Sequence, residues 1–297
     1  MTITRHHLDH QSRRRTYTMV RAESGLAPGA ALLIILHGTL QSGESLRTGY
    51  IGGSFDAMVA TGRVVVVYPD AVRREWNGAR KAVMFWRGAK DIDDVGFLRA
   101  LVDELVARCD IDPHRVFVMG FSLGGQMAIR LIHDAPGIAA GAAIISANLP
   151  APDNLSCQGA TPTPLPLMLV HGTADPLAPY LGGIMSGPKG VFPKGEHLSA
   201  EETAAYFAAS NGITSDPTTA WLYGAPAETG SVRLTRYQRP GCPSVHLYSV
   251  VGGGHQIPGT PAVWPRLFGP SPSRMSTADT VNDFFGMLPA KSMPGPE

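Results

Sequence analysis

The sequence predicts an α/β fold with a mostly parallel central sheet and helices on both faces. Five short apolar runs rich in Val, Ile and Leu support this prediction, at 31–36, 63–69, 115–120, 140–147 and 166–172. Unbroken runs of this length are typical of strands buried on both faces, as in parallel sheets. Helical patterns lie between these runs, and strands that alternate with helices indicate βαβ units wound around a sheet.

The clearest helical pattern spans 92–108, where the apolar side chains fall on one stripe. Asp93 and Asp94 lie in its first turn, where negative charge suits the helix dipole. Segments 123–133, 200–210 and 276–288 are also expected to be helices. A sixth strand is expected at 245–251.

The chain has 297 residues, of which 44% are hydrophobic and 16% charged, so it can bury a large core. No internal repeat and no linker divides it. We expect one domain over 1–297, with a core of about 17–288 and short extensions at each end.

The charge balance argues against two classes of partner. The 25 basic and 24 acidic residues leave a net charge of +1, which gives no electrostatic case for binding nucleic acid or an anionic membrane. No apolar run reaches the roughly 18 residues that a membrane helix needs. Segment 1–20 lacks the apolar core of a signal peptide, so a cytoplasmic location is expected as the sequence is written. A secreted or periplasmic location stays open if a leader is removed.

The cysteine pattern predicts no metal site. Cys109, Cys157 and Cys242 have no C-x-x-C spacing, and no cluster of His and carboxylate residues has metal-ligand spacing. We expect neither a metal nor another cofactor. Three buried thiols are favoured slightly over a Cys157–Cys242 disulfide, which stays open.

One motif points to a nucleophile. In "VFVMGFSLGGQMAIRL" a predicted strand runs into Gly120-Phe121-Ser122-Leu123-Gly124, and a predicted helix follows. G-x-S-x-G between strand and helix is the context in which a tight turn exposes the serine hydroxyl. The free N–H groups and positive dipole end of the helix, which begins at Leu123, suit a developing oxyanion. Ser122 is therefore the candidate nucleophile.

A serine needs a base, and that base is commonly held by an acid. Asp175 follows the strand at 166–172 and precedes Pro176, which places it on a loop at the carboxyl edge of the sheet. His255 follows the strand at 245–251 after three glycines in "VVGGGHQIPG". These glycines let the backbone bend back over the sheet edge. The chain order Ser, acid, His is that of serine hydrolases with this kind of sheet.

The second donor for an oxyanion is expected on the loop after the first strand. In "LLIILHGTLQSG" the strand ends at His37-Gly38, and the N–H of Thr39, or that of Leu40, could point at the same oxygen as the N–H of Leu123.

With these motifs in place, the chain resembles the α/β-hydrolase esterases of the poly(3-hydroxybutyrate) depolymerase and feruloyl/acetylxylan esterase family. The resemblance runs from about Tyr17 to Phe285. The matching stretches are "LHGTLQSG", "YPDAVRREWNGAR", "DIDDVGFLRALVDEL", "DIDPHRVFVMGFSLGGQMA", "VHGTADPLAPYLGG" and "GGGHQIPG". It implies an α/β-hydrolase catalytic domain with the same nucleophile, acid and base.

The chain departs from the family pattern at two positions. Relatives often have a cysteine where this chain has Thr39, and a tryptophan where it has Ile257. The first change leaves the backbone donor in place, whereas the second removes an aromatic wall near the site.

The substrate is predicted from loops near the site. Only 147–164 separates two predicted strands at the position where many such enzymes carry a helical cap, so we expect no large cap domain and an open, shallow site. Aromatic and apolar residues at this edge are candidates for substrate binding. For each of the three tryptophans, a role as a loop anchor is an equally good interpretation. The candidates are Leu40, Trp76, Trp86, Tyr180, Ile257 and Trp264.

These features predict a serine carboxylic ester hydrolase that works through an acyl-enzyme and needs no cofactor. Feruloyl or related aromatic and carbohydrate esters are the first expectation, and an ester substrate of polymeric form fits an open site. A depolymerase or oligomer hydrolase for poly(3-hydroxybutyrate) or another polyester is the alternative. A hydrolase fold that has lost catalysis and only binds is the alternative from another class, and it predicts a missing triad residue, which is not found. The oligomeric state stays open.

Overall fold

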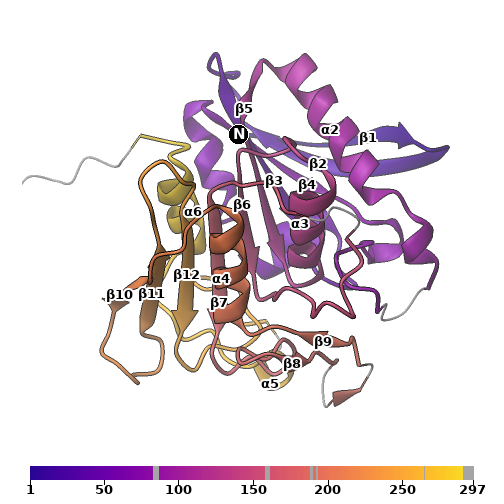
Figure 1. Cartoon of the computed structure of the whole chain (residues 1–297). Coiled ribbons are helices and arrows are strands. Elements are labelled where there is room, and N and C mark those ends of the chain that lie inside the picture. The colour runs from indigo at the N-terminus through magenta and orange to yellow at the C-terminus, as the bar shows by residue number, and fades with distance from the viewer. Residues whose placement is uncertain (83–86, 158–160, 188–189, 192, 264, 290–297) are drawn as a thin grey trace, which may run out of the picture.

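The computed structural model describes residues 1–82, 87–157, 161–187, 190–191, 193–263 and 265–289 (Figure 1). A ten-stranded sheet runs through its middle in the order β1-β2-β4-β3-β5-β6-β7-β12-β11-β10. The strands of this sheet are β1 (Thr2–His10), β2 (Arg13–Arg21), β3 (Ala30–Leu36), β4 (Val64–Pro69), β5 (Ile111–Phe121), β6 (Gly141–Ile145), β7 (Leu167–Gly172), β10 (Thr218–Tyr223), β11 (Val232–Tyr237) and β12 (Val245–Val250). Two short strands, β8 (Gly183–Ile184) and β9 (Glu196–His197), form a separate pair.

The sheet is parallel at its centre and antiparallel at both edges. Strands β4, β3, β5, β6, β7 and β12 pair in parallel. The pairs β1–β2 and β2–β4 at one edge, and β12–β11 and β11–β10 at the other, are antiparallel. The carboxyl ends of the central strands therefore meet at one edge of the sheet, where ligands bind in such folds.

Helices cover both faces of the sheet. The α-helices are α1 (Gly43–Ser45), α2 (Asp94–Cys109), α3 (Leu123–Asp134), α4 (Ala200–Ser210), α5 (Pro265–Phe268) and α6 (Thr277–Phe285). Short 3-10 or π segments are η1 (Leu46–Tyr50), η2 (Asp56–Thr61), η3 (Val72–Arg74) and η4 (Arg87–Asp91). Helices α2, α3 and α4 pack on one face, and α6 packs with η1 and η2 on the other (Figure 1).

The alternation of side chains along the central strands builds two cores. In β3, Leu32 and Ile34 point into the core under α2 and α3, while Leu33 and Ile35 point into the core under α6. All seven residues of β3 are buried. Burial on both faces explains why the strand is an unbroken apolar run, and it confirms the predicted α/β fold.

The edge strands were not expected from the sequence. Residues 2–10, which we assigned to a terminal extension, form β1, and β10 and β11 also lie outside the predicted strands. Strand β1 alternates between half-buried and exposed residues, and β10 is largely exposed. Neither has the buried apolar run by which the central strands are recognised.

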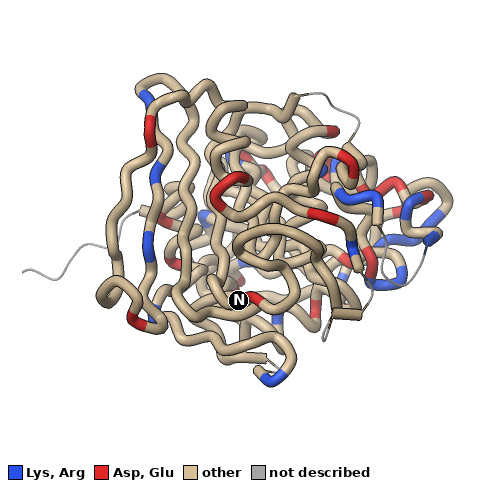
Figure 2. The backbone as a smooth tube through the Cα atoms, turned by 60° about the horizontal axis from the view of Figure 1, so that its bottom comes forward, with Lys and Arg blue, Asp and Glu red and all other residues tan. Residues whose placement is uncertain are grey.

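The structure also bears on the cysteines, on metal-binding groups, on membrane-spanning helices and on the distribution of charge. All three cysteines are free and half-buried, so neither the disulfide nor full burial is found. Among the described residues, no group of three or more metal-binding side chains is present. No described helix is both long and apolar enough to cross a bilayer. Basic and acidic segments occur side by side along the tube in Figure 2.

Candidate active site

Ser122 stands at the turn between β5 and α3. Its backbone has φ 55° and ψ −114°, a strained conformation that lifts the side chain out of the turn. Its N–H donates to the carbonyl oxygen of Ile145 on the neighbouring strand at 2.9 Å. The G-x-S-x-G motif is thus found in the strand–turn–helix setting that the sequence predicted.

The glycine at 124 lets the helix start close to the end of β3. A Cβ placed on Gly124 would lie 2.1 Å from the carbonyl oxygen of Leu36 and 2.8 Å from that of His37, both backbone atoms. Contacts this short cannot be relieved by turning a side chain. The same glycine therefore holds the serine turn against the loop at 37–41.

Gly124→Ala is expected to destabilise the protein by about 3 kcal/mol, the upper part of the usual range for an overfilled site. The relief of the clash must also move the loop at 37–41, so kcat/KM should fall as well. Thermal unfolding and ester hydrolysis measure the two effects. Gly49→Ala is the matched control, because a Cβ there meets nothing within 4 Å. Equal stability of the two variants would contradict the close approach.

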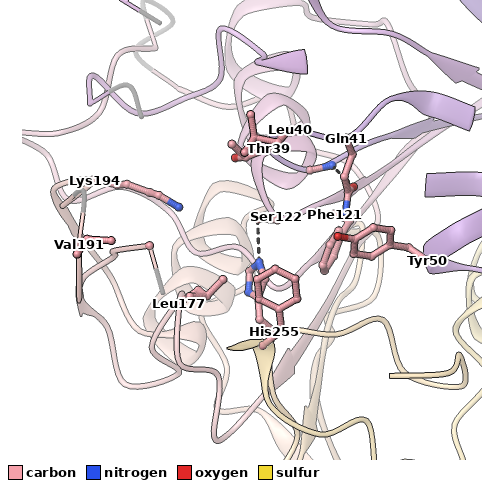
Figure 3. A pocket seen from close by; sticks show the side chains of 13 residues that line it. Thr39, Leu40, Gln41, Tyr50, Phe121, Ser122, Leu177, Val191, Lys194 and His255 are labelled. Carbon is pink, nitrogen blue, oxygen red and sulfur yellow. Dashed lines mark hydrogen bonds between the residues drawn. The ribbon is translucent and has the colours of Figure 1, made fainter. Parts of the chain in front are cut away.

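Ser122, His255 and Asp175 form one hydrogen-bonded chain, of which Figure 3 shows the link between Ser122 and His255. Nε2 of His255 lies 2.8 Å from Oγ of Ser122, and Nδ1 lies 2.7 Å from Oδ2 of Asp175. The other carboxylate oxygen, Oδ1, accepts the N–H groups of Leu177 and Ala178 at 2.8 Å each. Both oxygens of the acid are therefore occupied, which fixes its orientation toward the imidazole.

The surroundings keep Asp175 ionised. Burial alone would raise the pKa of this carboxyl group, but the charge of His255 and hydrogen bonds from His171 and His255 outweigh it and hold the pKa well below its usual range. Nε2 of His171 lies 3.4 Å from Oδ2 of Asp175 and 2.8 Å from the carbonyl oxygen of Ala178. His171 is thus a local hydrogen-bonding partner of the acid.

The glycines before His255 allow its loop to pass close to the backbone of Phe268 and Gly269. A Cβ on Gly254 would lie 2.2 Å from the carbonyl oxygen of Phe268. The N–H of His255 donates to that same carbonyl. The rings of Phe121 and Phe268 flank the imidazole, with centroid distances of 5.2 and 6.3 Å. The loop therefore brings the histidine back over the sheet edge, as its glycines predicted.

The loop after β3 was predicted to supply the second backbone donor for an oxyanion, from Thr39 or Leu40. The N–H of Leu40 already donates to the carbonyl oxygen of Arg74, at 3.1 Å, and that of Gly38 donates to Oε1 of Gln41, at 2.8 Å. No acceptor for the N–H of Thr39 occurs among the described residues. Of the two alternatives, Thr39 is therefore the donor that remains available. Leu123 begins α3, so its N–H has no acceptor within the helix.

His37 holds this loop from behind. Nε2 of its ring accepts the N–H of Ala71 at 3.0 Å, so the ring proton is on Nδ1 and donates to the carbonyl oxygen of Gly38 at 2.7 Å. Burial lowers the pKa of His37 to about 4, and the ring is neutral. Nε1 of Trp76 donates to the carbonyl oxygen of His37 at 3.0 Å.

A cavity of about 330 Å³ opens in front of Ser122 (Figure 3). Its lining is mostly apolar and comes from residues within four parts of the chain, 38–50, 121–122, 177–194 and 255–268. The lining residues are Gly38, Thr39, Leu40, Gln41, Tyr50, Phe121, Ser122, Leu177, Gly187, Val191, Lys194, His255 and Phe268. Two of the predicted site residues in the first loop, Thr39 and Leu40, are among them.

Three predicted substrate-binding residues do not line the cavity. Trp76 is 1% exposed and packs behind the loop, hydrogen-bonded to His37. Ile257 is 2% exposed and belongs to the core under α6. Tyr180 is buried, with its hydroxyl 2.7 Å from Oγ of Ser249. All three anchor loops because their apolar bodies find core contacts. Trp86 and Trp264 lie outside the described residues.

Several lining residues were missed by the sequence analysis. Phe121 and Leu177 adjoin the predicted nucleophile and acid, so their position alone could have identified them. Tyr50, Val191, Lys194 and Phe268 lie in loops or short helices without a motif.

No cap covers the site from the segment between β6 and β7. The described residues 148–157 and 161–166 contain no helix. Part of the wall comes instead from the segment between β8 and β9, which contributes Gly187, Val191 and Lys194.

Comparisons with known proteins agree on one family. A Phospholipase/Carboxylesterase family model matches residues 89–189. The proposed esterase NocK of Nocardia uniformis subsp. tsuyamanensis is 32% identical over 267 residues, which cover 87% of this chain and 75% of NocK. Poly(3-hydroxyalkanoate) depolymerase C of Paucimonas lemoignei is 25% identical over 89% of this chain and 65% of its own length. Feruloyl esterase B of Piromyces equi is 28% identical over 56% of this chain, which matches 29% of that esterase.

A solved structure supports the fold. The acetyl xylan esterase from Aspergillus awamori superposes with a TM-score of 0.64, over 96% of this chain and all of that one. The two sequences are 14% identical, so the likeness concerns the fold. The α/β-hydrolase fold and the family resemblance are both confirmed.

Proposed function

The chain belongs to the α/β-hydrolase esterase family, whose members are serine ester hydrolases, and we propose that Ser122, His255 and Asp175 carry out the hydrolysis. The observation behind this proposal is the hydrogen-bonded chain from Ser122 Oγ through His255 to Asp175 at the floor of an apolar cavity. The base lies within hydrogen-bonding distance of both the nucleophile and the orienting acid, as acyl transfer requires.

In the first half of the reaction, Oγ of Ser122 attacks the ester carbonyl carbon and its proton passes to Nε2 of His255. The carbonyl oxygen becomes an oxyanion, which accepts the N–H groups of Thr39 and Leu123. The bond to the alcohol oxygen then breaks, and that oxygen takes the proton from Nε2. The alcohol leaves, and the acyl group stays on Ser122.

In the second half, water attacks the acyl-enzyme and gives a proton to Nε2 of His255. The same two N–H groups hold the second oxyanion. The bond to Oγ breaks, Oγ regains its proton, and the carboxylic acid leaves. Throughout, the ionised Asp175 stabilises the imidazolium that forms twice.

The substrate is proposed from the cavity and the relatives together. Tyr50, Phe121 and Phe268 give the cavity aromatic walls, which suit an aromatic acyl group such as feruloyl. The likeness to Feruloyl esterase B favours the same class. The second candidate is an oligomer of a hydroxyalkanoate, favoured by the likeness to a depolymerase and by Lys194 in the cavity wall.

A substrate panel distinguishes the two candidates. We expect the enzyme to cleave methyl ferulate and a 3-hydroxybutyrate trimer at different kcat/KM, and the higher value identifies the class. Acetylated xylan tests whether a polymer can reach the serine. Hydrolysis of none of these esters, nor of a p-nitrophenyl butyrate standard, would contradict the proposed function.

A further inference from the structure

Lys194 is held in the cavity wall by its own backbone. Its N–H donates to the carbonyl oxygen of Met185 at 2.8 Å, and its carbonyl oxygen accepts Nδ2 of Asn154 at 2.9 Å. Asn154 is itself buried, and its side chain occupies the space that a Cβ on the next residue, Gly195, would need. The base of the lysine side chain is therefore fixed on both sides.

The side chain of Lys194 is buried and points into the cavity. The residue is 5% exposed and lines the same cavity as Ser122 and His255. In Figure 3 Lys194 and Val191 lie on one side of Ser122, and Tyr50 and Phe121 lie on the other. Within the described part of the chain, Nζ of Lys194 has no hydrogen-bond or ion-pair partner. Only solvent in the cavity, or an acceptor that enters it, can therefore pair this ammonium, and a carboxylate would pair it more strongly than water does.

The neighbouring charges do not complete this site. Asp175 and Glu75 attract the ammonium, and Arg80 repels it. Asp175 already gives both its oxygens to His255 and to the N–H groups of Leu177 and Ala178. An anion that enters the cavity from solvent is thus the natural partner for Nζ.

We propose that Lys194 is a specificity residue that binds a carboxylate of the substrate, so that the cavity prefers esters carrying a free carboxylate near the scissile bond. The apolar remainder of the lining, such as Leu177 and Phe268, would hold the carbon chain between that carboxylate and the ester. An ammonium–carboxylate contact is a charge-assisted hydrogen bond, which is stronger than a hydrogen bond between neutral groups. The inference rests on the proposed function, and of its two substrate candidates it favours the hydroxyalkanoate oligomers, which carry a carboxylate at one end.

The test compares charged and neutral esters of similar size. On the acyl side, mono-p-nitrophenyl glutarate is paired with p-nitrophenyl hexanoate. On the alcohol side, the 3-hydroxybutyrate dimer is paired with its methyl ester. We expect the wild type to have the higher kcat/KM for the charged member of at least one pair, and that pair shows which side of the ester faces Lys194.

The variant Lys194→Met keeps the length of the side chain and removes the charge. Its ratio of kcat/KM for the charged ester over the neutral one should fall by about 10- to 100-fold, the range expected for a lost hydrogen bond to a charged group. The loss should appear mainly in KM, and Lys194→Arg should recover part of it. Lys81→Met is the matched control, because Lys81 is an exposed lysine outside the cavity lining, and among the described residues its Nζ donates only to the carbonyl oxygen of Asp153.

Two results would overturn the inference: a wild type without preference in either pair, or a Lys194→Met variant whose charged-to-neutral ratio equals that of the wild type. Product inhibition gives a second measurement that needs no variant, since glutarate should inhibit wild-type hydrolysis of the neutral ester better than glutaramide does. Ser122→Ala separates the two hypotheses. Suppose that Ser122→Ala abolishes hydrolysis, while Lys194→Met leaves the charged-to-neutral ratio of kcat/KM unchanged. The proposed function then stands, and only the assignment of Lys194 fails.

The preference should also depend on pH. Burial lowers the pKa of Lys194 to about 7. The charged and titratable groups around it are Arg80, Asp175, Glu75 and His197, and the ring of His197 is neutral because burial lowers its pKa to about 3. The ammonium form is lost as the pH rises through this range, so the charged-to-neutral ratio should fall from pH 6 to about pH 9. A bound carboxylate shifts the decline upward.

Discussion

Ser122→Ala is expected to lower kcat/KM for every ester by about 10⁴- to 10⁶-fold, the range found when a triad nucleophile is removed. The variant keeps the cavity, the oxyanion donors and the His255–Asp175 pair, but it has no Oγ to attack the carbonyl carbon. The fall should appear mainly in kcat, because the contacts that bind the substrate remain. Steady-state kinetics with p-nitrophenyl butyrate measure it.

The matched control is Ser54→Ala, which also removes a buried hydroxyl group. Oγ of Ser54 has no hydrogen-bond partner among the described residues, and Ser54 does not line the cavity. Its activity should equal that of the wild type. A Ser122→Ala variant that folds normally and keeps more than a tenth of the wild-type rate would show that another group is the nucleophile.

Asp175→Asn is expected to lower kcat by about 10⁴-fold although the variant is nearly isosteric. The N–H groups of Leu177 and Ala178 both donate to Oδ1, so they keep the carbonyl oxygen of the new amide on that side. Its NH2 group must then face Nδ1 of His255. Nδ1 becomes an acceptor, the ring proton moves to Nε2, and Nε2 can no longer take the proton of Ser122.

The control for this variant is Asp216→Asn, at an exposed aspartate in a loop that does not line the cavity. Single-turnover kinetics separate the loss in chemistry from any change in substrate binding. Equal rates for Asp175→Asn and the wild type would mean that the ionised acid at this position does not control the imidazole.

The sequence predicts the centre of the molecule well and its edges poorly. The strands at the centre are buried on both faces, so their apolar runs are continuous, as in β3 and β4. The triad residues each follow such a strand, and the topology brings the strand ends together. By contrast, β1 and β10 are half-buried or exposed and carry polar residues, so their pairing depends on neighbours distant in the sequence.

The lining of the cavity is the part that the sequence could not predict. A tryptophan near a strand end can equally be a wall or an anchor, and Trp76 is an anchor because its N–H finds the carbonyl oxygen of His37. Lys194 stands in a segment without a motif between two short strands. Only the folding of that segment over the sheet edge turns its ammonium toward the serine.

The most direct test of the account is covalent labelling of the nucleophile. A fluorophosphonate ester should add once to the wild-type protein, and peptide mapping should place the adduct on Ser122. Ser122→Ala should take up no label under the same conditions, while Ser54→Ala should be labelled like the wild type. An adduct on another residue, or equal labelling of Ser122→Ala, would contradict the assignment of Ser122 as the nucleophile.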